Sequence, residues 1–356
     1  MKKKKIILIV LIILVIGLTM VYSSSHIWAQ YKENDALYYL KRQGLFMIGL
    51  ILLFIFSKID YHLYQKYSHL ILIVSFLLLI LVLIPGIGIV RGGSRSWFNL
   101  GLFALQPSEI FKIALIIYVS DYISHHYHQM KKLRYCLKPL IVMGLGFLLI
   151  MLQPDFGSGF VMCCSILVMI ILTPFPFRYV VFLGCAGVIA IVLMILSAPY
   201  RLKRITAFLD PFQDPLGSGF QMIQSLYAIG PGGILGVGFD QSIQKHFYLP
   251  EPQTDFIFAI YLEEFGFIGG VLFILLYAYL FITCFNFSKE CDDLFGSFLI
   301  IGITSMIGIQ TMINLGVVVG LFPVTGVTLP LMSYGGTSLL VTLIEIGIIY
   351  NIIKSI

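Results

Sequence analysis

The sequence predicts an all-α integral membrane protein of about ten transmembrane helices, with one large extracellular loop between the seventh and eighth helices. Three observations lead to this prediction. Hydrophobic residues make up 59% of the 356-residue chain and charged residues 11%, whereas a soluble domain has about 25% charged residues. Apolar runs recur at the length of roughly 17–25 residues that a helix needs to cross the hydrocarbon core. Between them lies one long stretch rich in acids, glycines and prolines.

Ten apolar stretches are the predicted spanning helices. They cover residues 6–23, 43–57, 69–90, 102–124, 137–152, 159–174, 178–198, 256–287, 294–322 and 328–353. The first is interpreted as an uncleaved helix, because no small-residue cleavage site follows the basic start at Lys2–Lys5. A transmembrane barrel is excluded, because its strands would alternate polar and apolar residues over about ten positions.

Basic residues near the helix ends predict the orientation. The run Lys2–Lys5 favours a cytoplasmic N-terminus, which places the C-terminus inside and the loop of residues 199–256 outside. The whole chain, 1–356, is then one multi-pass membrane domain in which this loop carries the candidate chemistry. The outside cations gather near Arg91–Arg95 and Arg201–Arg204, as an anionic ligand would require.

Other functional classes find little support in the composition. The six cysteines show no zinc-ligand spacing and none falls in an outside loop, so we expect packing residues and neither a metal centre nor disulfides. The basic run at the N-terminus is an orientation signal, so no nucleic-acid partner is expected.

The loop ends in the sequence Pro250-Glu251-Pro252-Gln253-Thr254-Asp255, directly before an apolar helix. The two prolines hold the backbone extended ahead of this helix. Thr254 or Asp255 could simply cap the helix. Alternatively, a carboxylate that is half withdrawn from water at the membrane edge gains proton affinity and becomes a better base.

A second motif, Gln106-Pro107-Ser108-Glu109-Ile110-Phe111-Lys112, opens a predicted helix at its proline. Glu109 and Lys112 are three residues apart and share a helix face. Charges in an apolar span are costly unless they are paired or face a wet cavity. They are therefore either an ion pair that only holds helices together, or a pair whose Lys112 reaches a phosphate or carboxylate.

Three further motifs interrupt the apolar pattern. Arg95, which follows Gly92-Gly93 and precedes Trp97 by two residues, could grip a phosphate or anchor the chain at the interface. Gln153-Pro154-Asp155 and the segment 323–338, which contains Ser333, break predicted helices. Non-helical backbone at membrane depth is tolerated only against protein or water. It indicates a cavity or a structural re-entrant turn.

Taken together, the motifs resemble those of the SEDS family, which includes FtsW, RodA and SpoVE. In chain order they are GSRSW, QPSEIFK, QPDFG, YRLKRITAFLDPFQDPLGSGFQ, GPGGILGVGF, PEPQTDFIFAIYLEE and PVTGVTLPLMSYGGTS. Each is weak alone, but seven in series cover nearly the whole chain. The loop is more similar to the FtsW/SpoVE branch than to RodA, and most similar to SpoVE.

The resemblance implies a ten-helix bundle and a peptidoglycan glycosyltransferase. Such an enzyme polymerises lipid II into β-1,4 glycan strands at the outer face of the bacterial cytoplasmic membrane, here for cell division or spore cortex synthesis. It implies that the essential loop aspartate is Asp255, and that the acid, lysine and arginine of the family motifs are Glu109, Lys112 and Arg95. The chain departs from the pattern at Gln253, where many members have histidine, so no proton relay is expected there.

Glycan transfer of this kind predicts the residue roles. The acceptor 4-hydroxyl attacks the anomeric carbon opposite the undecaprenyl diphosphate, so Asp255 is the expected base. Cations stabilise charge on the leaving group, and a Mg²⁺ or Mn²⁺ ion on the diphosphate would need no dedicated ligand cage. The candidates that bind or poise the substrate are Lys112, Glu109, Arg95, Arg204, Glu251, Gln153 and Ser333.

Two alternative functions remain open at this point. A lipid II flippase would also use broken helices and buried charges, but it would hold its charges near the bilayer midplane. A scaffold that only recruits a transpeptidase would leave the loop acid and the Glu109/Lys112 pair unexplained. The resemblance implies a class B penicillin-binding protein as partner, together with divisome or sporulation septum proteins. Glycines at 302, 308, 316 and 320 would either offer that partner a surface or serve internal packing.

Overall fold

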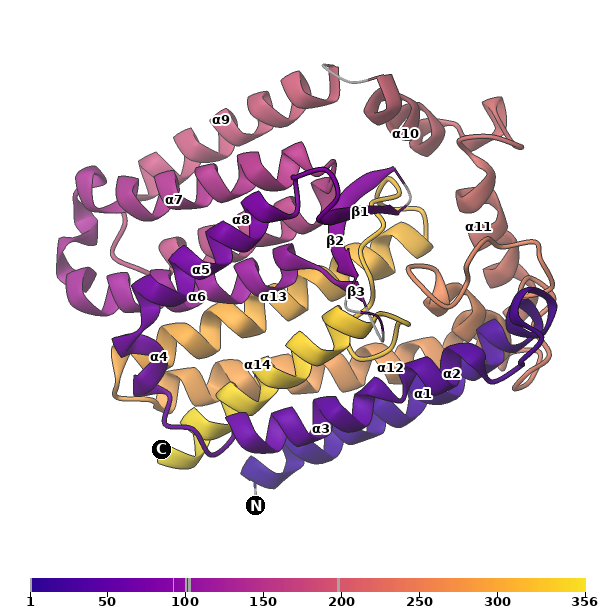
Figure 1. Cartoon of the computed structure of the whole chain (residues 1–356), viewed down its shortest axis with the longest axis horizontal. Coiled ribbons are helices and arrows are strands. Elements are labelled where there is room, and N and C mark those ends of the chain that lie inside the picture. Colours follow the sequence, from indigo (N-terminus) through magenta and orange to yellow (C-terminus); the bar gives the residue numbers. More distant parts are fainter. Residues whose placement is uncertain (1, 92, 100, 102–103, 197–198) are drawn as a thin grey trace.

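The computed structural model describes residues 2–91, 93–99, 101, 104–196 and 199–356 (Figure 1). The helices are α1 Lys2–Glu33, α2 Tyr38–Gln43, α3 Leu45–Phe56, α4 His62–Lys66, α5 Ser68–Leu81, α6 Pro107–His126, α7 Leu133–Leu152, α8 Phe156–Ile171, α9 Phe177–Leu196, α10 Pro199–Leu209, α11 Phe220–Gly232, α12 Ile257–Glu290, α13 Leu294–Val318 and α14 Gly336–Ser355. The strands are β1 Gly88–Arg91, β2 Ser94–Asn99 and β3 Ala104–Leu105.

The chain is a predominantly helical membrane protein, in agreement with the predicted class, and each of the ten apolar stretches contains a helix. Within the described residues, six segments are long and apolar enough to cross a membrane: α1, the α2–α3 pair, α7, α12, α13 and α14. Helices α5 and α8 and the stretch Phe177–Ile189 of α9 are apolar but shorter. Helix α6 spans 20 residues and carries Glu109, Lys112 and Asp121.

A small antiparallel sheet replaces the helix ends that were predicted on either side of residue 95. The strand order is β1-β2-β3, with Gly88 opposite Phe98 and Phe98 opposite Leu105. Helix α5 ends at Leu81, well before the predicted end of its span, because Pro85 and Gly86 follow and Gly86 has a φ of +90°. A left-handed φ is easy for glycine and ends helical geometry.

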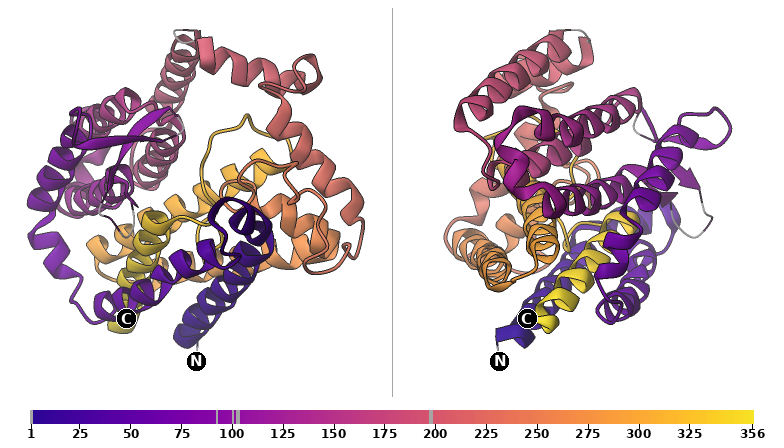
Figure 2. Two further views of the ribbon diagram at one scale, coloured as in Figure 1. Left: turned by 45° about the vertical axis from the view of Figure 1, so that its right-hand side comes forward. Right: turned by 90° about the vertical axis from the view of Figure 1, so that its left-hand side faces the viewer.

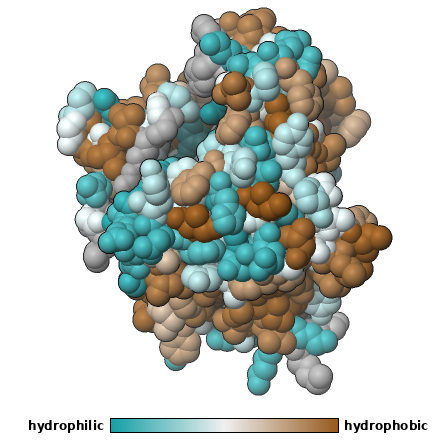
Figure 3. All heavy atoms as spheres, turned by 90° about the vertical axis from the view of Figure 1, so that its right-hand side faces the viewer, coloured by the Kyte–Doolittle hydropathy of each residue, from teal (hydrophilic) through white to brown (hydrophobic). Residues whose placement is uncertain are grey.

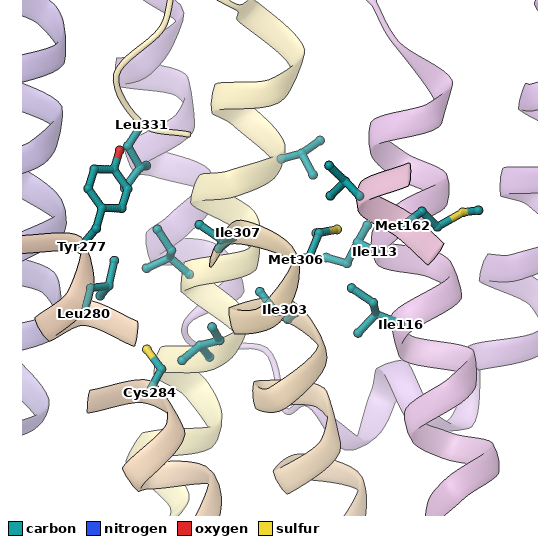
Figure 4. Close-up of a cluster of buried hydrophobic side chains, with 14 of the residues drawn as sticks. Ile113, Ile116, Met162, Tyr277, Leu280, Cys284, Ile303, Met306, Ile307 and Leu331 are labelled. Atoms are coloured by element: carbon teal, nitrogen blue, oxygen red, sulfur yellow. The ribbon is translucent and has the colours of Figure 1, made fainter. Parts of the chain in front are cut away.

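Helix α13 forms the centre of the bundle and packs against α12, α6, α8 and α14. Figure 4 shows its side chains Ile303, Met306 and Ile307 between α12 on one side and α6 and α8 on the other. Most of the α13 surface is therefore covered by other helices. The two chain termini lie at one end of the bundle, and α10, α11 and the sheet lie toward the other (Figures 1 and 2).

The α13 glycines serve internal packing, which settles one of the open alternatives for Gly302 and Gly316. A Cβ atom at Gly302 would lie 2.5 Å from Cγ2 of Ile116, and one at Gly316 would lie 2.3 Å from the ring of Phe322. At Gly308 the nearest atom would be 3.7 Å away, an ordinary contact distance. The surface suggested for a partner helix is therefore covered at Gly302 and Gly316.

The loop before α12 is joined to that helix through its backbone. Helix α12 is interrupted at Gly266, whose φ and ψ are 64° and −165°. Across this break, the amides of Val237 and Gly238 donate to the carbonyls of Glu263 and Glu264, at 2.9 and 3.0 Å. In the other direction, amides that follow Gly266 donate to carbonyls of the loop. The approach requires glycine, since a Cβ at Gly266 would lie 2.3 Å from the Gly236 nitrogen.

A buried cluster of charged side chains ties the same loop to α1. The ammonium of Lys245 is 1% exposed and lies 3.3 Å from a carboxylate oxygen of Glu264, which is fully buried. Lys245 also pairs with Asp240. Ser23 of α1 donates to Glu264 at 2.5 Å. Burial of this charge is tolerable because each member has a charged or hydrogen-bonding partner.

Candidate active site

A cavity of about 580 Å³ opens where the broken helices meet. Its walls come from the start of α6, strand β2, the turn between α7 and α8, helix α10, the segment before α12, helix α13 and the segment 323–338. Figure 3 views the molecule from the side where α10, α11 and the loop lie, and shows hydrophilic residues gathered there among hydrophobic ones. The re-entrant segments predicted from their prolines and glycines therefore do line a cavity.

Five of the eight sequence-predicted site residues line this cavity: Asp255, Lys112, Glu109, Arg204 and Glu251. They come from the loop, from α6 and from α10, segments far apart in the sequence. The structure thus brings two loop acids, the α6 ion pair and an arginine to a shared space.

The carboxyl of Asp255 is half-buried at the cavity, just before α12 begins at Ile257. Withdrawal from water raises the pKa of Asp255 above its ordinary value, and the nearby Glu251 carboxylate raises this pKa further. A hydrogen bond from the Thr254 hydroxyl at 3.0 Å and the positive charge of Arg204 lower it. Asp255 does not cap α12, whose N-cap residue is Phe256 without a side-chain cap. The capping alternative is therefore not what the structure shows.

Lys112 and Glu109 form the ion pair that their spacing predicts. The ammonium nitrogen of Lys112 lies 2.8 Å from Oε1 of Glu109, and the two side chains are 2% and 9% exposed. The same nitrogen donates to Oε1 of Gln310 at 3.0 Å. The pair therefore lines the cavity with its charges shielded from bulk water.

Arginines surround the cavity. Arg204 and Arg201 come from α10, and Arg42 comes from α2. Arg204 donates to the carbonyl of Val324 at 3.2 Å, and Arg42 lies over the ring of Tyr38 at 4.6 Å. Guanidinium groups match the geometry of phosphate oxygens. The arrangement is suited to a polyanionic ligand.

The other three candidates, Arg95, Gln153 and Ser333, do not line the cavity. Arg95 sits on β2, and its Nη1 donates to the Leu83 carbonyl at 3.4 Å. Its neighbours Ser94 and Ser96 face the cavity instead. The role of Arg95 at the ligand therefore stays a prediction, and its side chain is not among those that line the cavity.

Gln153 and Ser333 hold the cavity walls in place. Gln153 is fully buried, and its side chain donates to the Leu79 carbonyl at 3.3 Å. Ser333 accepts from the Leu329 amide at 2.8 Å within the broken segment before α14. In the Gln153-Pro154-Asp155 motif, Pro154 and Asp155 line the cavity. Asp155 accepts from Gln106 at 2.8 Å and caps α8 by accepting from the Ser158 amide at 3.1 Å.

Further polar residues near the cavity were not singled out from the sequence. Gln310 lines it from α13. Glu345 of α14 is 2% exposed and interacts electrostatically with Lys112 and Glu109. Their signal is a strongly polar side chain in a mostly apolar span, which marks a protein-facing or cavity-facing position.

The described residues contain no group of three or more His, Cys, Asp or Glu side chains placed to hold a metal ion. What the cavity does offer is one carboxyl with raised proton affinity among several fixed cations. Such a set can take a proton from a hydroxyl and stabilise negative charge that develops on a departing phosphate.

Comparisons of this chain with known proteins agree on one family. Residues 3–356 match the model of a family described as cell cycle protein, FTSW_RODA_SPOVE. Stage V sporulation protein E of Bacillus subtilis is 50% identical over 349 residues, covering 98% of this chain and 95% of the relative. A probable peptidoglycan glycosyltransferase FtsW of Saccharophagus degradans is 39% identical, covering 96% of this chain and 90% of the relative.

Solved structures share the fold over the whole chain. A chain from a study of how a peptidoglycan synthase complex coordinates polymerization and crosslinking matches with a TM-score of 0.81 and 30% identity, covering 99% of this chain and 97% of that chain. Rod shape determining protein RodA of Thermus thermophilus matches with a TM-score of 0.72 and 25% identity, covering 99% of this chain and 96% of that chain.

Proposed function

The chain belongs to the FtsW/RodA/SpoVE family of cell cycle proteins, and we propose that it is a peptidoglycan glycosyltransferase that polymerises lipid II. FtsW relatives carry the glycosyltransferase activity in their names. The observation that supports this function most directly is the half-buried carboxyl of Asp255 in one cavity with Lys112 and Arg204. The proposal assigns a role to each.

Asp255 is the proposed base. The 4-hydroxyl of the acceptor sugar gives its proton to the Asp255 carboxylate while its oxygen forms a bond to the anomeric carbon of the donor. The bond from that carbon to the diphosphate breaks, and the electron pair leaves with the phosphate oxygen. The configuration at the anomeric carbon inverts and gives a β-1,4 linkage. A carboxylate with raised proton affinity suits this step better than an exposed one.

The cations stabilise the leaving undecaprenyl diphosphate. Arg204 and Arg201 of α10 are the proposed ligands of its oxygens, and Lys112 is a deeper positive charge in the same cavity. Charge that develops on the leaving group is stabilised by groups already in place. A Mg²⁺ or Mn²⁺ ion, if bound, would take its ligands from the substrate phosphates and from one or two cavity carboxylates.

The setting proposed for this reaction is the outer face of the bacterial cytoplasmic membrane, with both termini in the cytoplasm. The lysine-rich start supports the orientation, and the two termini lie at one end of the bundle (Figure 1). The proposed partner is a class B penicillin-binding protein, supported by the likeness to a synthase complex that polymerises and crosslinks. The similarity to a stage V sporulation protein supports a role at the sporulation septum.

The test is polymerisation of lipid II by the purified protein, with and without the cognate transpeptidase. Long glycan strands from the parent protein and none from Asp255→Asn would support the proposal, because loss of a general base costs about 10²–10⁴-fold in rate. Parent-like polymerisation by Asp255→Asn would remove the base assignment. Movement of lipid II across vesicle bilayers without polymerisation would instead identify a flippase.

A further inference from the structure

Helix α13 carries two buried amide side chains that face the same way. Gln310 and Asn314 are four residues apart and are 5% and 1% exposed. Residues at this spacing are neighbours on one helix face. Both side chains form hydrogen bonds to groups outside their own helix, whereas the adjacent Thr311 bonds only to the Ile307 carbonyl one turn back.

Gln310 joins α6 to the broken segment before α14. Its Oε1 accepts from the Lys112 ammonium at 3.0 Å, and its Nε2 donates to the Thr328 carbonyl at 3.1 Å. The ammonium can only donate, so the amide has one orientation that satisfies both neighbours. The position of the Lys112 head is thus tied to the backbone at Thr328.

Asn314 makes the corresponding connection to the loop. Its Nδ2 donates to the backbone carbonyls of Asp255 and Val327, at 2.7 and 2.8 Å. Val327 and Thr328 are consecutive, so the two amides hold one strip of backbone between them. Lys112, this strip and Asp255 are therefore fixed to a single helix through four hydrogen bonds.

We propose that Gln310 and Asn314 are positioning residues that set the Asp255 carboxyl and the Lys112 ammonium in the geometry needed for glycosyl transfer. This inference rests on the proposed function. Helix α13 is suited to the task because it is enclosed by α12, α6 and α8 (Figure 4) and by α14. A helix that is held by packing on several sides keeps the groups bonded to it in a fixed alignment. Misplacement of a reacting group by about 1 Å can cost on the order of 100-fold in rate.

A purely structural role predicts a different result. Non-helical backbone inside a membrane protein needs hydrogen-bond partners, and the two amides satisfy the carbonyls of Val327 and Thr328. If that were their whole function, their loss would lower stability and leave the folded molecules as active as the parent.

The experiment compares Asn314→Ala and Gln310→Met with the control Thr311→Ala in the full-length protein in detergent. Gln310→Met keeps the side-chain volume and removes both hydrogen bonds. Thr311 is 2% exposed on the same helix and bonds only within it. Thermal melting gives the folded fraction, and lipid II polymerisation gives kcat and KM per folded molecule.

We expect kcat to fall by about 10- to 100-fold in the two amide variants, with KM within about 3-fold of the parent. Thr311→Ala should keep the parent kcat. Parent-like kcat per folded molecule in Gln310→Met would overturn the proposal, and so would a rise in KM at unchanged kcat, which indicates direct substrate contact. If Asn314→Ala does not fold, the kcat and KM of Gln310→Met alone test the proposal. A parent protein that does not polymerise lipid II would refute the proposed function itself.

Discussion

The ammonium of Lys112 lies 2.8 Å from the carboxylate of Glu109, and the buried carboxyl of Glu345 in α14 interacts electrostatically with both. Two carboxyl groups and one ammonium are thus buried together, and Glu109 and Lys112 of this group line the cavity. Removal of either member of a buried pair leaves a charge uncompensated and costs about 3–5 kcal/mol. Because Glu345 is close to the pair, the effect of removing Lys112 should differ from the effect of removing Glu109.

We predict that Lys112→Ala is more damaging than Glu109→Ala. Without Glu109, Lys112 still has the hydrogen bond to Gln310 and the nearby Glu345 carboxyl, whereas without Lys112 the buried Glu109 carboxylate has lost its cation. Both variants should melt at lower temperature, and Lys112→Ala should also lose turnover per folded molecule, because Lys112 lines the cavity. Melting curves combined with polymerisation assays check this. Equal activity per folded molecule in the two variants would exclude Lys112 from the reaction.

The pH dependence of polymerisation should respond in opposite directions to two neighbours of Asp255. Transfer needs the ionised carboxylate, so kcat/KM falls as pH drops through the raised pKa of Asp255. The Glu251 carboxylate raises this pKa and Arg204 lowers it. Glu251→Gln should therefore move the acid limb of the profile to lower pH, and Arg204→Gln to higher pH. Shifts in the same direction would show that the limb belongs to another group.

The buried cluster around Lys245 should matter for stability. Lys245→Ala leaves Glu264 fully buried without its cation, so we expect a loss of about 3–5 kcal/mol. Lys41→Ala is the matched control, because Lys41 pairs with Asp35 at 2.7 Å but is 64% exposed, and exposed pairs contribute little. Denaturation monitored in detergent compares the two. A similar change in both variants would mean that the cluster is not desolvated in the protein.

Two glycines of α13 should differ in their tolerance of alanine. Gly302→Ala places a methyl group 2.5 Å from Ile116 and 2.8 Å from the sulfur of Met169, so overpacking should cost about 1–3 kcal/mol. Gly308→Ala meets Phe281 at 3.7 Å and should be neutral or slightly stabilising, because alanine is the better helix former. Melting temperatures of the two variants test this, and an equal drop in both would contradict the packing.

The helices could be predicted because the apolar runs were long, and the Glu109/Lys112 pair because its spacing fits one helix face. The position of the Arg95 side chain could not be predicted, because it depends on strand β2, and the apolar residues on either side of residue 95 indicated helices. Asp155 and Gln153 stand in the same short motif, and the geometry of the α8 cap decides which one faces the cavity. Gln310 and Asn314 gave only the signal of amides in an apolar span. Their hydrogen-bond partners lie on segments that no sequence pattern links to α13.

The backbone join between the loop and α12 has a consequence for biogenesis. The amides of Val237 and Gly238 find their acceptors only on Glu263 and Glu264, which the ribosome adds later. We therefore expect these two amides to bond to water until α12 has been inserted and has formed its break at Gly266. In a nascent chain arrested before α12 is complete, the loop should be cleaved by added protease. In a chain arrested after α12, the loop should resist cleavage.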